Sequence, residues 1–447
     1  MSVVQQVAEP LLAPAWKRFS SSAGEHLLVV PHSRLFDLPP DAAARFDEGE
    51  AGALALAMTL GQAGLGEDRL DVVPEPAPQS LSLNVSSSCN LACTYCYAGR
   101  GSFGSAQIAA MTPEVANAAV DRLLADARRE RPVTVGFLGG EPFVNRALVH
   151  QVVAYASDAA RRRGFDLRFS VTTNGTLLNS ADLELVRSNR FAVTVSVDGG
   201  EGTHDRQRPS ASGRGSFRRL REHIRPLLIE PGKAQVAARV TVTRHDLDLP
   251  MLFAELRELG FAEIGFAPLR AVSGRPHRDA LRAEDWPVYL DALIRVAKAE
   301  IRSATAGMPL VLTNLAVALK QIGAGASSPF PCGAGGGYFS VAADGRWYAC
   351  HRAVGEPDFE LGDNTGLDQA KRRAFLSARH VHAKADCGAC WARYLCSGGC
   401  HQEAATRSLE SCDFVRGWLE FCLATACELP SPSAKAITDH RSGVCQA

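Results

Sequence analysis

The sequence lacks the features that would direct it to nucleic acid or to a membrane. Its 447 residues carry 48 basic and 48 acidic side chains, so the excess of positive charge typical of general nucleic-acid binders is absent. It has no run of 18 or more apolar residues, and its first residues do not combine a basic segment with a long apolar one. We therefore expect a cytoplasmic protein of two or three domains that binds neither nucleic acid nor a membrane.

Cysteine is missing from a long central stretch and concentrated on either side of it. Of the 13 cysteines, three lie between 89 and 96, none between 97 and 331, and ten between 332 and 445. A reducing compartment does not sustain structural disulfides, and cysteines that serve only packing would be scattered along the chain. The distribution therefore favours two regions of metal or redox chemistry.

Short runs rich in β-branched residues alternate with helical patterns from residue 81 onward. The expected strands are 81–86, 133–138, 167–173, 191–197, 235–242 and 262–267. The expected helices are 113–127, 145–163, 181–189, 215–228 and 248–259, the first of them capped by Thr112. This alternation is typical of βαβ units. It predicts an α/β fold whose core, residues 80–305, is a partial (β/α)6 barrel.

Two further regions flank the predicted barrel. Residues 1–79 predict a small α+β domain with strands at 26–30 and 35–38, a helix at 42–65 and a proline-rich linker. This domain is either a winged-helix-like peptide-recognition element, which captures a leader peptide by strand addition at 26–30, or a packing segment. The second flanking region is residues 306–447, of which residues 330–415 are rich in glycine and cysteine with little periodicity. We expect this region to be held together by metal ligands, with a helix at 412–428.

The first cysteine cluster lies directly after the first predicted strand of the barrel. Cys89, Cys93 and Cys96 follow it within one short loop, at the edge of a parallel sheet where ligands gather. Three thiolates can bind three irons of a 4Fe-4S cluster and leave the fourth iron open. A zinc knuckle or a set of buried thiols is the simpler alternative.

This loop, with Tyr95 before its last cysteine, resembles the C-x3-C-x-aromatic-C motif of the radical S-adenosylmethionine (radical SAM) superfamily. The resemblance implies reductive cleavage of S-adenosylmethionine, hydrogen abstraction by a 5′-deoxyadenosyl radical, and an electron donor such as flavodoxin or ferredoxin. It also implies a set of cofactor contacts: Tyr95, Gly139, Gly140, Glu141, Pro142, Thr173, Asn174, Ser196, Asp198 and Arg208.

The matches that carry these contacts differ in strength. Residues 139–142 look like the family's GGEP turn, which engages the methionine amino group. The alternative is an ordinary βα turn that binds no ligand. Residues 204–216, H-D-x-x-R and then G-x-G-S, repeat a stretch of peptide-modifying members. Arg208 either pairs with the cofactor carboxylate or is a solvated surface arginine.

The second group of cysteines resembles the SPASM extension of this superfamily. Its members are Cys332, Cys350, Cys387, Cys390, Cys396, Cys400 and Cys412. The resemblance implies two auxiliary 4Fe-4S clusters, and so three clusters in all. The cluster farther from the active site would be held by Cys387, Cys390, Cys396 and Cys412. The cluster nearer the active site would be held by Cys332, Cys350 and Cys400. The missing fourth ligand of the nearer cluster would be Cys422, Cys427, Cys445, a group such as His351, or the substrate. A pair of zinc ribbons is the structural alternative.

Enzymes with this extension mostly modify peptides or proteins. Residues 97–104, 397–403 and 412–418 resemble the maturases of quinohemoprotein amine dehydrogenase and the cyclophane- and thioether-forming peptide maturases. We therefore expect oxidative cross-linking of side chains, by a thioether or a carbon–carbon bond, in a precursor peptide or protein subunit.

Two other functions remain open from the sequence. Anaerobic sulfatase maturases, which form formylglycine, are the alternative, but an aspartate base is expected there directly after the G-x4-C cysteine. Here His351 occupies that position, as a candidate catalytic base or a structural histidine. A non-catalytic iron-sulfur electron carrier is the hypothesis from a different class.

Overall fold

Six parallel strands form the centre of the molecule. The structure is a computed structural model that describes residues 15–47, 73, 75–103, 110–269, 277–325, 327–403 and 407–429. The central strands are β4 (Ser80–Ser86), β5 (Val133–Gly139), β6 (Leu167–Thr173), β7 (Phe191–Ser196), β8 (Gln235–Val242) and β9 (Glu263–Pro268). Neighbours pair in parallel from β4 to β9. All six predicted strands are confirmed to within one residue at each end.

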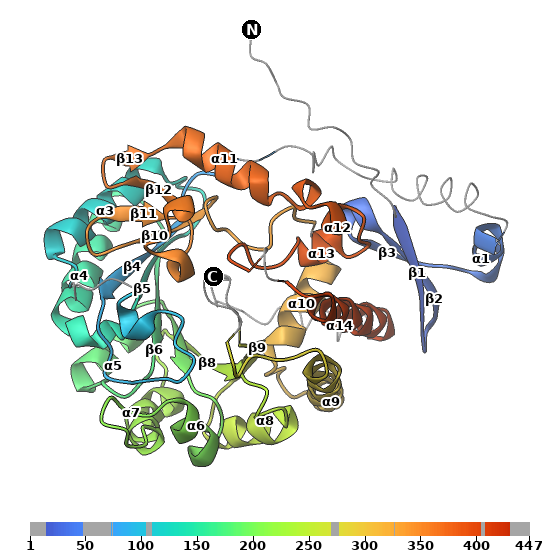
Figure 1. Ribbon diagram of the computed structural model, residues 1–447, viewed down its shortest axis with the longest axis horizontal. Coiled ribbons are helices and arrows are strands. Elements are labelled where there is room, and N and C mark those ends of the chain that lie inside the picture. Colours follow the sequence, from blue (N-terminus) through green and yellow to red (C-terminus); the bar gives the residue numbers. More distant parts are fainter. Residues whose placement is uncertain are drawn as a thin grey trace, which may run out of the picture.

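Helices cover the outer side of this curved sheet (Figure 1). They are α3 (Pro113–Asp126), α4 (Arg146–Arg163), α5 (Ser180–Ser188), α6 (Glu201–Gln207), α7 (Phe217–Ile229) and α8 (Leu249–Glu258). Thr112 caps α3 as predicted, since its hydroxyl accepts the backbone N–H of Val115 at 3.4 Å. The sequence did not predict α6, because its seven residues have no apolar stripe and its buried side chains are His204 and Gln207. No helix in the described ranges has the length and apolar character needed to cross a bilayer.

The barrel sheet continues into the cysteine-rich region, which the sequence did not predict. Strand β10 (Tyr338–Val341) pairs in parallel with β4, and β11 (Arg346–Tyr348), β12 (Glu360–Asp363) and β13 (Gly366–Leu367) extend the sheet to ten strands. The little periodicity seen in the sequence agrees with this, because strands of two to four residues are too short to show a period. The helices beyond the barrel are α9 (Asp285–Thr305), α10 (Thr313–Gly323), α11 (Gln369–Arg379), α12 (Ala385–Gly388), α13 (Arg393–Cys396) and α14 (Leu409–Glu428).

The N-terminal residues form a separate antiparallel sheet of β1 (Trp16–Ser21), β2 (Gly24–Val29) and β3 (Arg34–Asp37), followed by α1 (Pro40–Asp47). The rest of the predicted helix 42–65 lies outside the described residues. Strand β2 is the middle strand and is paired on both sides. The prediction that residues 26–30 take up a leader strand was therefore wrong, because their backbone groups are already hydrogen-bonded.

This N-terminal sheet lies against α14 (Figure 1). Lys17 Nζ is 2.6 Å from a carboxylate oxygen of Glu420. The backbone N–H and hydroxyl of Ser22 donate to Glu428 at 2.9 and 2.7 Å. The two ends of the described chain are thereby joined through α14.

Two glycines let the turn after β5 approach the cysteine loop closely. Gly139 has a φ of 130°, and a Cβ added there would lie 2.3 Å from the carbonyl oxygen of Ser86. A Cβ on Gly140 would lie 2.2 Å from the carbonyl oxygen of Ser88. Both distances are far below a normal van der Waals contact, so side chains at either position would push the turn away from the loop.

Replacing Gly140 with alanine tests this close approach. We expect Gly140→Ala to displace the backbone at Ser88, next to Cys89, and to lower the iron content of the anaerobically reconstituted protein by about one cluster. The matched control is Gly202→Ala in α6, where an added Cβ meets nothing within 4 Å, and its iron content should equal that of the wild type. Wild-type iron content in Gly140→Ala would contradict the argument.

Candidate active site and cysteine clusters

The first cysteine loop lies beyond the carboxyl end of β4. It is fixed to the end of α6 and to the segment that follows by backbone hydrogen bonds, from Thr94 to the carbonyl of Gln207 at 2.9 Å and from Ala92 to that of Pro209 at 2.8 Å. Within it, the thiols of Cys89, Cys93 and Cys96 are half-buried and close enough to interact electrostatically.

The environment of these thiols suits a metal. Burial raises the pKa of the Cys89 thiol to about 12, so without a metal this thiol stays protonated. Backbone N–H groups point at two of the sulfurs, from Leu91 to Cys89 at 3.4 Å and from Arg100 to Cys96 at 3.2 Å. Such donors stabilise thiolates in an iron-sulfur cluster, and three convergent sulfurs fit a cluster with one open iron.

Glu141 lies next to this loop and is 1% exposed. Its carboxylate accepts hydrogen bonds from the hydroxyl of Thr173 and the backbone N–H of Asn174, both at 2.7 Å. The Asn174 amide donates to Asn90, the neighbour of Cys89, at 3.0 Å. Burial raises the pKa of Glu141 to about 7. The structure thus brings Glu141, Thr173 and Asn174 together beside the cysteine loop.

Asp198 holds a buried network on the other side of the loop. Its carboxylate accepts the hydroxyl of Tyr95, the guanidinium of Arg208 at 2.8 and 3.3 Å, and the backbone N–H of Thr241 at 3.0 Å. The Asp198 and Arg208 side chains are only 0% and 9% exposed. The alternative of a solvated surface Arg208 was therefore wrong. Ser196 lies half-buried at the end of β7, outside this network.

The segment 204–216 supports Arg208 from behind. The Asp205 carboxylate accepts the backbone N–H groups of Ser216 and Phe217 at 2.7 and 2.8 Å. The His204 ring shares a hydrogen bond of 3.1 Å with the Ser216 hydroxyl, and burial lowers its pKa to about 4. These contacts give the motif at 204–216 a structural role, because they hold the segment that contains Arg208 in position.

Seven of the remaining cysteines form two groups in space. The Cys350 thiol interacts with those of Cys400 and Cys332. A second group contains Cys387, Cys390, Cys396 and Cys412. This division is the one that the resemblance implied.

Two of the candidates for the missing ligand of the nearer group lie elsewhere. Cys422 is in the apolar core, and Cys427 lies beside His26 and Asp37. Cys445 is outside the described residues. Of the candidates named from the sequence, His351 and a group of the substrate therefore remain.

Basic side chains, which the spacing of the cysteines did not indicate, surround the second group. Arg407 donates to the sulfur of Cys387 at 2.9 Å and to the carbonyl of Gly398 at 2.8 Å. Arg416 hydrogen-bonds to Cys390. These cations offset the negative charge of clustered thiolates.

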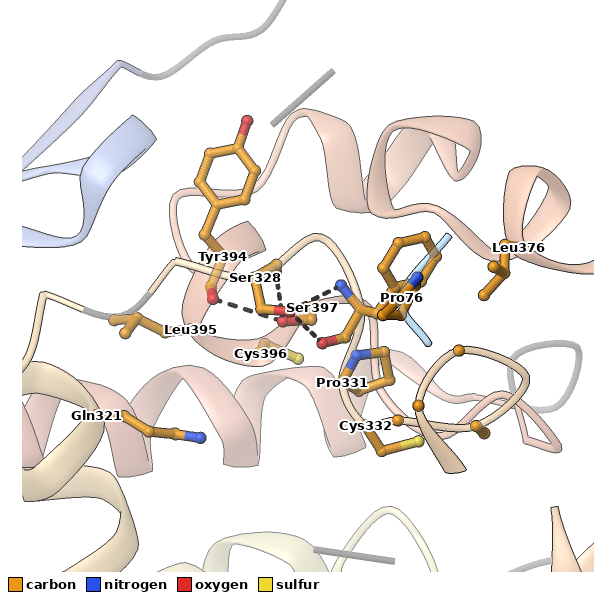
Figure 2. A pocket seen from close by; sticks show the side chains of 15 residues that line it. Pro76, Gln321, Ser328, Pro331, Cys332, Leu376, Tyr394, Leu395, Cys396 and Ser397 are labelled. Atoms are coloured by element: carbon orange, nitrogen blue, oxygen red, sulfur yellow. Dashed lines mark hydrogen bonds between the residues drawn. The ribbon is translucent and has the colours of Figure 1, made fainter. Parts of the chain in front are cut away.

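A pocket of about 360 Å³ opens between the two groups (Figure 2). It is lined by Cys332, from the group with Cys350 and Cys400, and by Cys396, from the group of four. Its wall is held by Ser397, whose hydroxyl donates to the carbonyl of Ser328 at 2.7 Å. Pro76, from the segment before β4, also lines it.

His351 begins a hydrogen-bonded chain that leads to β4. Its Nδ1 is 2.9 Å from the hydroxyl of Tyr338, which is 2.6 Å from that of Ser82. The Ser82 hydroxyl donates to that of Ser340 at 3.1 Å. Burial lowers the pKa of His351 to about 3, so its imidazole is neutral at physiological pH and only weakly basic.

Comparison with known proteins gives three main likenesses. Residues 83–228 match the model of the radical SAM superfamily. The serine-type anaerobic sulfatase-maturating enzyme of Klebsiella pneumoniae is 25% identical over 372 residues, which cover 77% of this chain and 89% of that enzyme. The solved structure of native anSMEcpe with bound AdoMet superposes with a TM-score of 0.67 at 21% identity, over 79% of this chain and 100% of that one.

A further likeness is to SuiB of Streptococcus suis, with a TM-score of 0.53 at 13% identity over 89% of this chain and 97% of that one. At such low identity, the two solved structures indicate a shared fold. The α/β core with its cysteine-rich C-terminal region is the fold that the sequence predicted.

Removing the Arg208 guanidinium tests the Asp198 network. Arg208→Ala leaves a buried carboxylate without its cation, so we expect the free energy of unfolding to fall by about 3–5 kcal/mol. Arg218→Ala is the matched control, because Arg218 is 82% exposed in its pair with Glu201 and should change stability by less than about 0.5 kcal/mol. Denaturant unfolding followed by circular dichroism measures both, and equal effects would rule out a buried network.

Proposed function

Because this chain is a radical SAM enzyme, we propose that it oxidises a ribosomally made peptide or protein and joins two of its side chains by a thioether or carbon–carbon bond. The observation that carries the proposal is the convergence of Cys89, Cys93 and Cys96 with Glu141 at one end of the barrel. The second support is the pair of cysteine groups that β10 attaches to the same sheet. A related structure of SuiB, described as bound to the precursor peptide SuiA, supports a peptide substrate.

The cysteines fit three iron-sulfur clusters, one in the loop and two in the C-terminal region. When bound in the loop, a 4Fe-4S cluster supplies the electron that cleaves S-adenosylmethionine. In the proposal, Glu141 would bind the methionine amino group, and Thr173, Asn174 and Ser196 would contact the ribose and the carboxylate of the cofactor. Asp198 and Arg208 hold Tyr95 and the loop in place. Flavodoxin or ferredoxin is the proposed electron donor.

His351 is the proposed base. Its hydrogen bond with Tyr338 occupies Nδ1, which leaves Nε2 as the atom that takes a proton from the substrate. Tyr338 and Ser82 fix the imidazole and connect it to β4. The neutral imidazole has the lone pair that this role needs, but its low pKa makes it a weak base, which counts against the assignment.

Formylglycine formation is the second candidate. The relatives named as sulfatase-maturating enzymes cover most of this chain, which favours it. The histidine at position 351, where an aspartate is expected, speaks against it. Both reactions begin with hydrogen abstraction from a side chain, so the product distinguishes them.

The N-terminal sheet is the proposed recognition element for a leader peptide. Since β2 is paired on both sides, an added strand would lie along β3, the outer strand remote from β1. Strand addition uses backbone hydrogen bonds and therefore tolerates varied leader sequences.

Product analysis tests the proposal. Anaerobic protein given dithionite and S-adenosylmethionine should release 5′-deoxyadenosine, and Cys93→Ala should abolish this release while Cys422→Ala, outside both groups, retains it. A cysteine-containing peptide encoded beside the gene should lose two hydrogens, yield no fragment ions between the linked residues, and fail to react with a hydrazide. A hydrazide-reactive product would identify formylglycine formation, and no 5′-deoxyadenosine would identify an electron carrier.

The raised pKa of Glu141 predicts a pH dependence of cofactor binding. Below pH 7 the carboxyl is largely protonated, and above pH 7 it is an anion that accepts hydrogen bonds from an amino group more strongly. We expect the affinity for S-adenosylmethionine to rise between pH 6 and 8 by about tenfold more in the wild type than in Glu141→Gln. Equilibrium dialysis of the reconstituted protein measures this, with the exposed Glu201→Gln as the control. Parallel curves for wild type and Glu141→Gln would remove Glu141 from the cofactor site.

A further inference from the structure

We propose that His26, Asp37 and Cys427 form a mononuclear zinc site that fastens the N-terminal sheet to α14. One ligand atom from each of the three lies within 4.8 Å of the other two. The site is separate from the two C-terminal cysteine groups and from the loop of Cys89. It does not depend on the proposed reaction.

The fold brings the three side chains together from distant parts of the sequence. His26 of β2 and Asp37 of β3 are direct partners in the antiparallel ladder, and Nδ1 of His26 is 2.9 Å from Oδ1 of Asp37. Cys427 is in the last turn of α14. The contacts of Ser22 with Glu428 and of Lys17 with Glu420 hold α14 over the sheet independently of any metal.

The donor set suits zinc rather than an iron-sulfur cluster. One thiolate, one imidazole and one carboxylate are ligands that Zn²⁺ accepts together, whereas an iron-sulfur cluster needs several thiolates. Donor atoms around a tetrahedral zinc lie about 3.3–3.8 Å apart. The observed separations, between 2.9 and 4.8 Å, require shifts of about 1 Å or less. Solvent can supply the fourth ligand, because the Asp37 side chain is 88% exposed.

The surroundings of His26 orient its ring for this role. The side chain is 2% exposed, and Nε2 is 2.7 Å from the hydroxyl of Ser21. A proton on Nε2, donated to Ser21, leaves the lone pair of Nδ1 on the side of Asp37. Metal-bound histidines are commonly fixed through their second nitrogen in this way.

The charge around Cys427 favours a cation. The carboxylates of Asp37 and Glu428 lie close enough to interact with its thiol. A thiolate beside two carboxylates is unfavourable alone and becomes favourable around a divalent cation. The alternative is a simple cross-strand pair of His26 and Asp37 with a neighbouring thiol, which predicts that no metal binds.

Element analysis of the full-length, cluster-containing protein tests the site. Protein purified without oxygen from zinc-supplemented medium should contain about one zinc per chain by mass spectrometry of the elements. Cys427→Ser and His26→Gln should lose most of this zinc, while the matched control Cys422→Ser, on the same helix but in the apolar core, retains it. Iron content should be the same in all four proteins, which distinguishes loss of this site from misfolding.

X-ray absorption at the zinc edge identifies the ligands despite the iron present. We expect one sulfur at about 2.3 Å and nitrogen or oxygen neighbours at about 2.0–2.2 Å. A zinc chelator should lower the melting temperature of the wild type and leave that of Cys427→Ser unchanged. Wild-type protein without zinc, zinc retained in Cys427→Ser, or a zinc spectrum lacking sulfur would each overturn the proposal.

Discussion

A single buried carboxylate, that of Asp198, fixes the active end of the barrel. It binds a tyrosine from the cysteine loop, an arginine from the segment after α6 and a backbone N–H from β8. A charge removed from water is stable only when such partners surround it. The position of the loop relative to β7 and β8 therefore depends on satisfying one buried ion, together with the backbone hydrogen bonds of Ala92 and Thr94.

The pairing of β10 with β4 has a comparable effect on the C-terminal region. It turns a cysteine-rich segment into an extension of the barrel sheet, and it places Tyr338 against Ser82 inside that sheet. His351 lies three residues after the end of β11, and its ring nitrogen is thereby brought to 2.9 Å from the Tyr338 hydroxyl. The distance between a candidate base and the cysteine loop is thus set by strand pairing, which is more rigid than a flexible linker between two domains.

The sequence predicted the barrel well because long, regular βα repeats leave a clear apolar period. The division of the C-terminal cysteines into two groups followed from their resemblance to the SPASM extension. Prediction from the sequence failed where the stabilising contacts are polar or the elements are short. Helix α6 buries His204 instead of an apolar stripe, and β10–β13 are shorter than one readable period.

The electrostatic neighbours of the cysteines were also beyond sequence reasoning. Arg407 lies 20 residues from Cys387, and nothing in that spacing indicates contact. Arg208 reads as a surface residue by type, and its burial depends on Asp198, which lies in the turn after another strand. Such pairs are determined by the tertiary fold, and sequence periodicity contains no information on them.

The order of strands also affects how this chain is made. Ser82 of β4 and its partner Ser340 of β10 are 258 residues apart, so a ribosome working at about 5–20 residues per second needs about 13–50 s to supply the second strand. Until then one edge of β4 has unpaired backbone groups, which are prone to pair with other chains. A nascent barrel therefore exposes this edge until the C-terminal strands are made, and a chaperone that covered β4 during that time would reduce association with other chains.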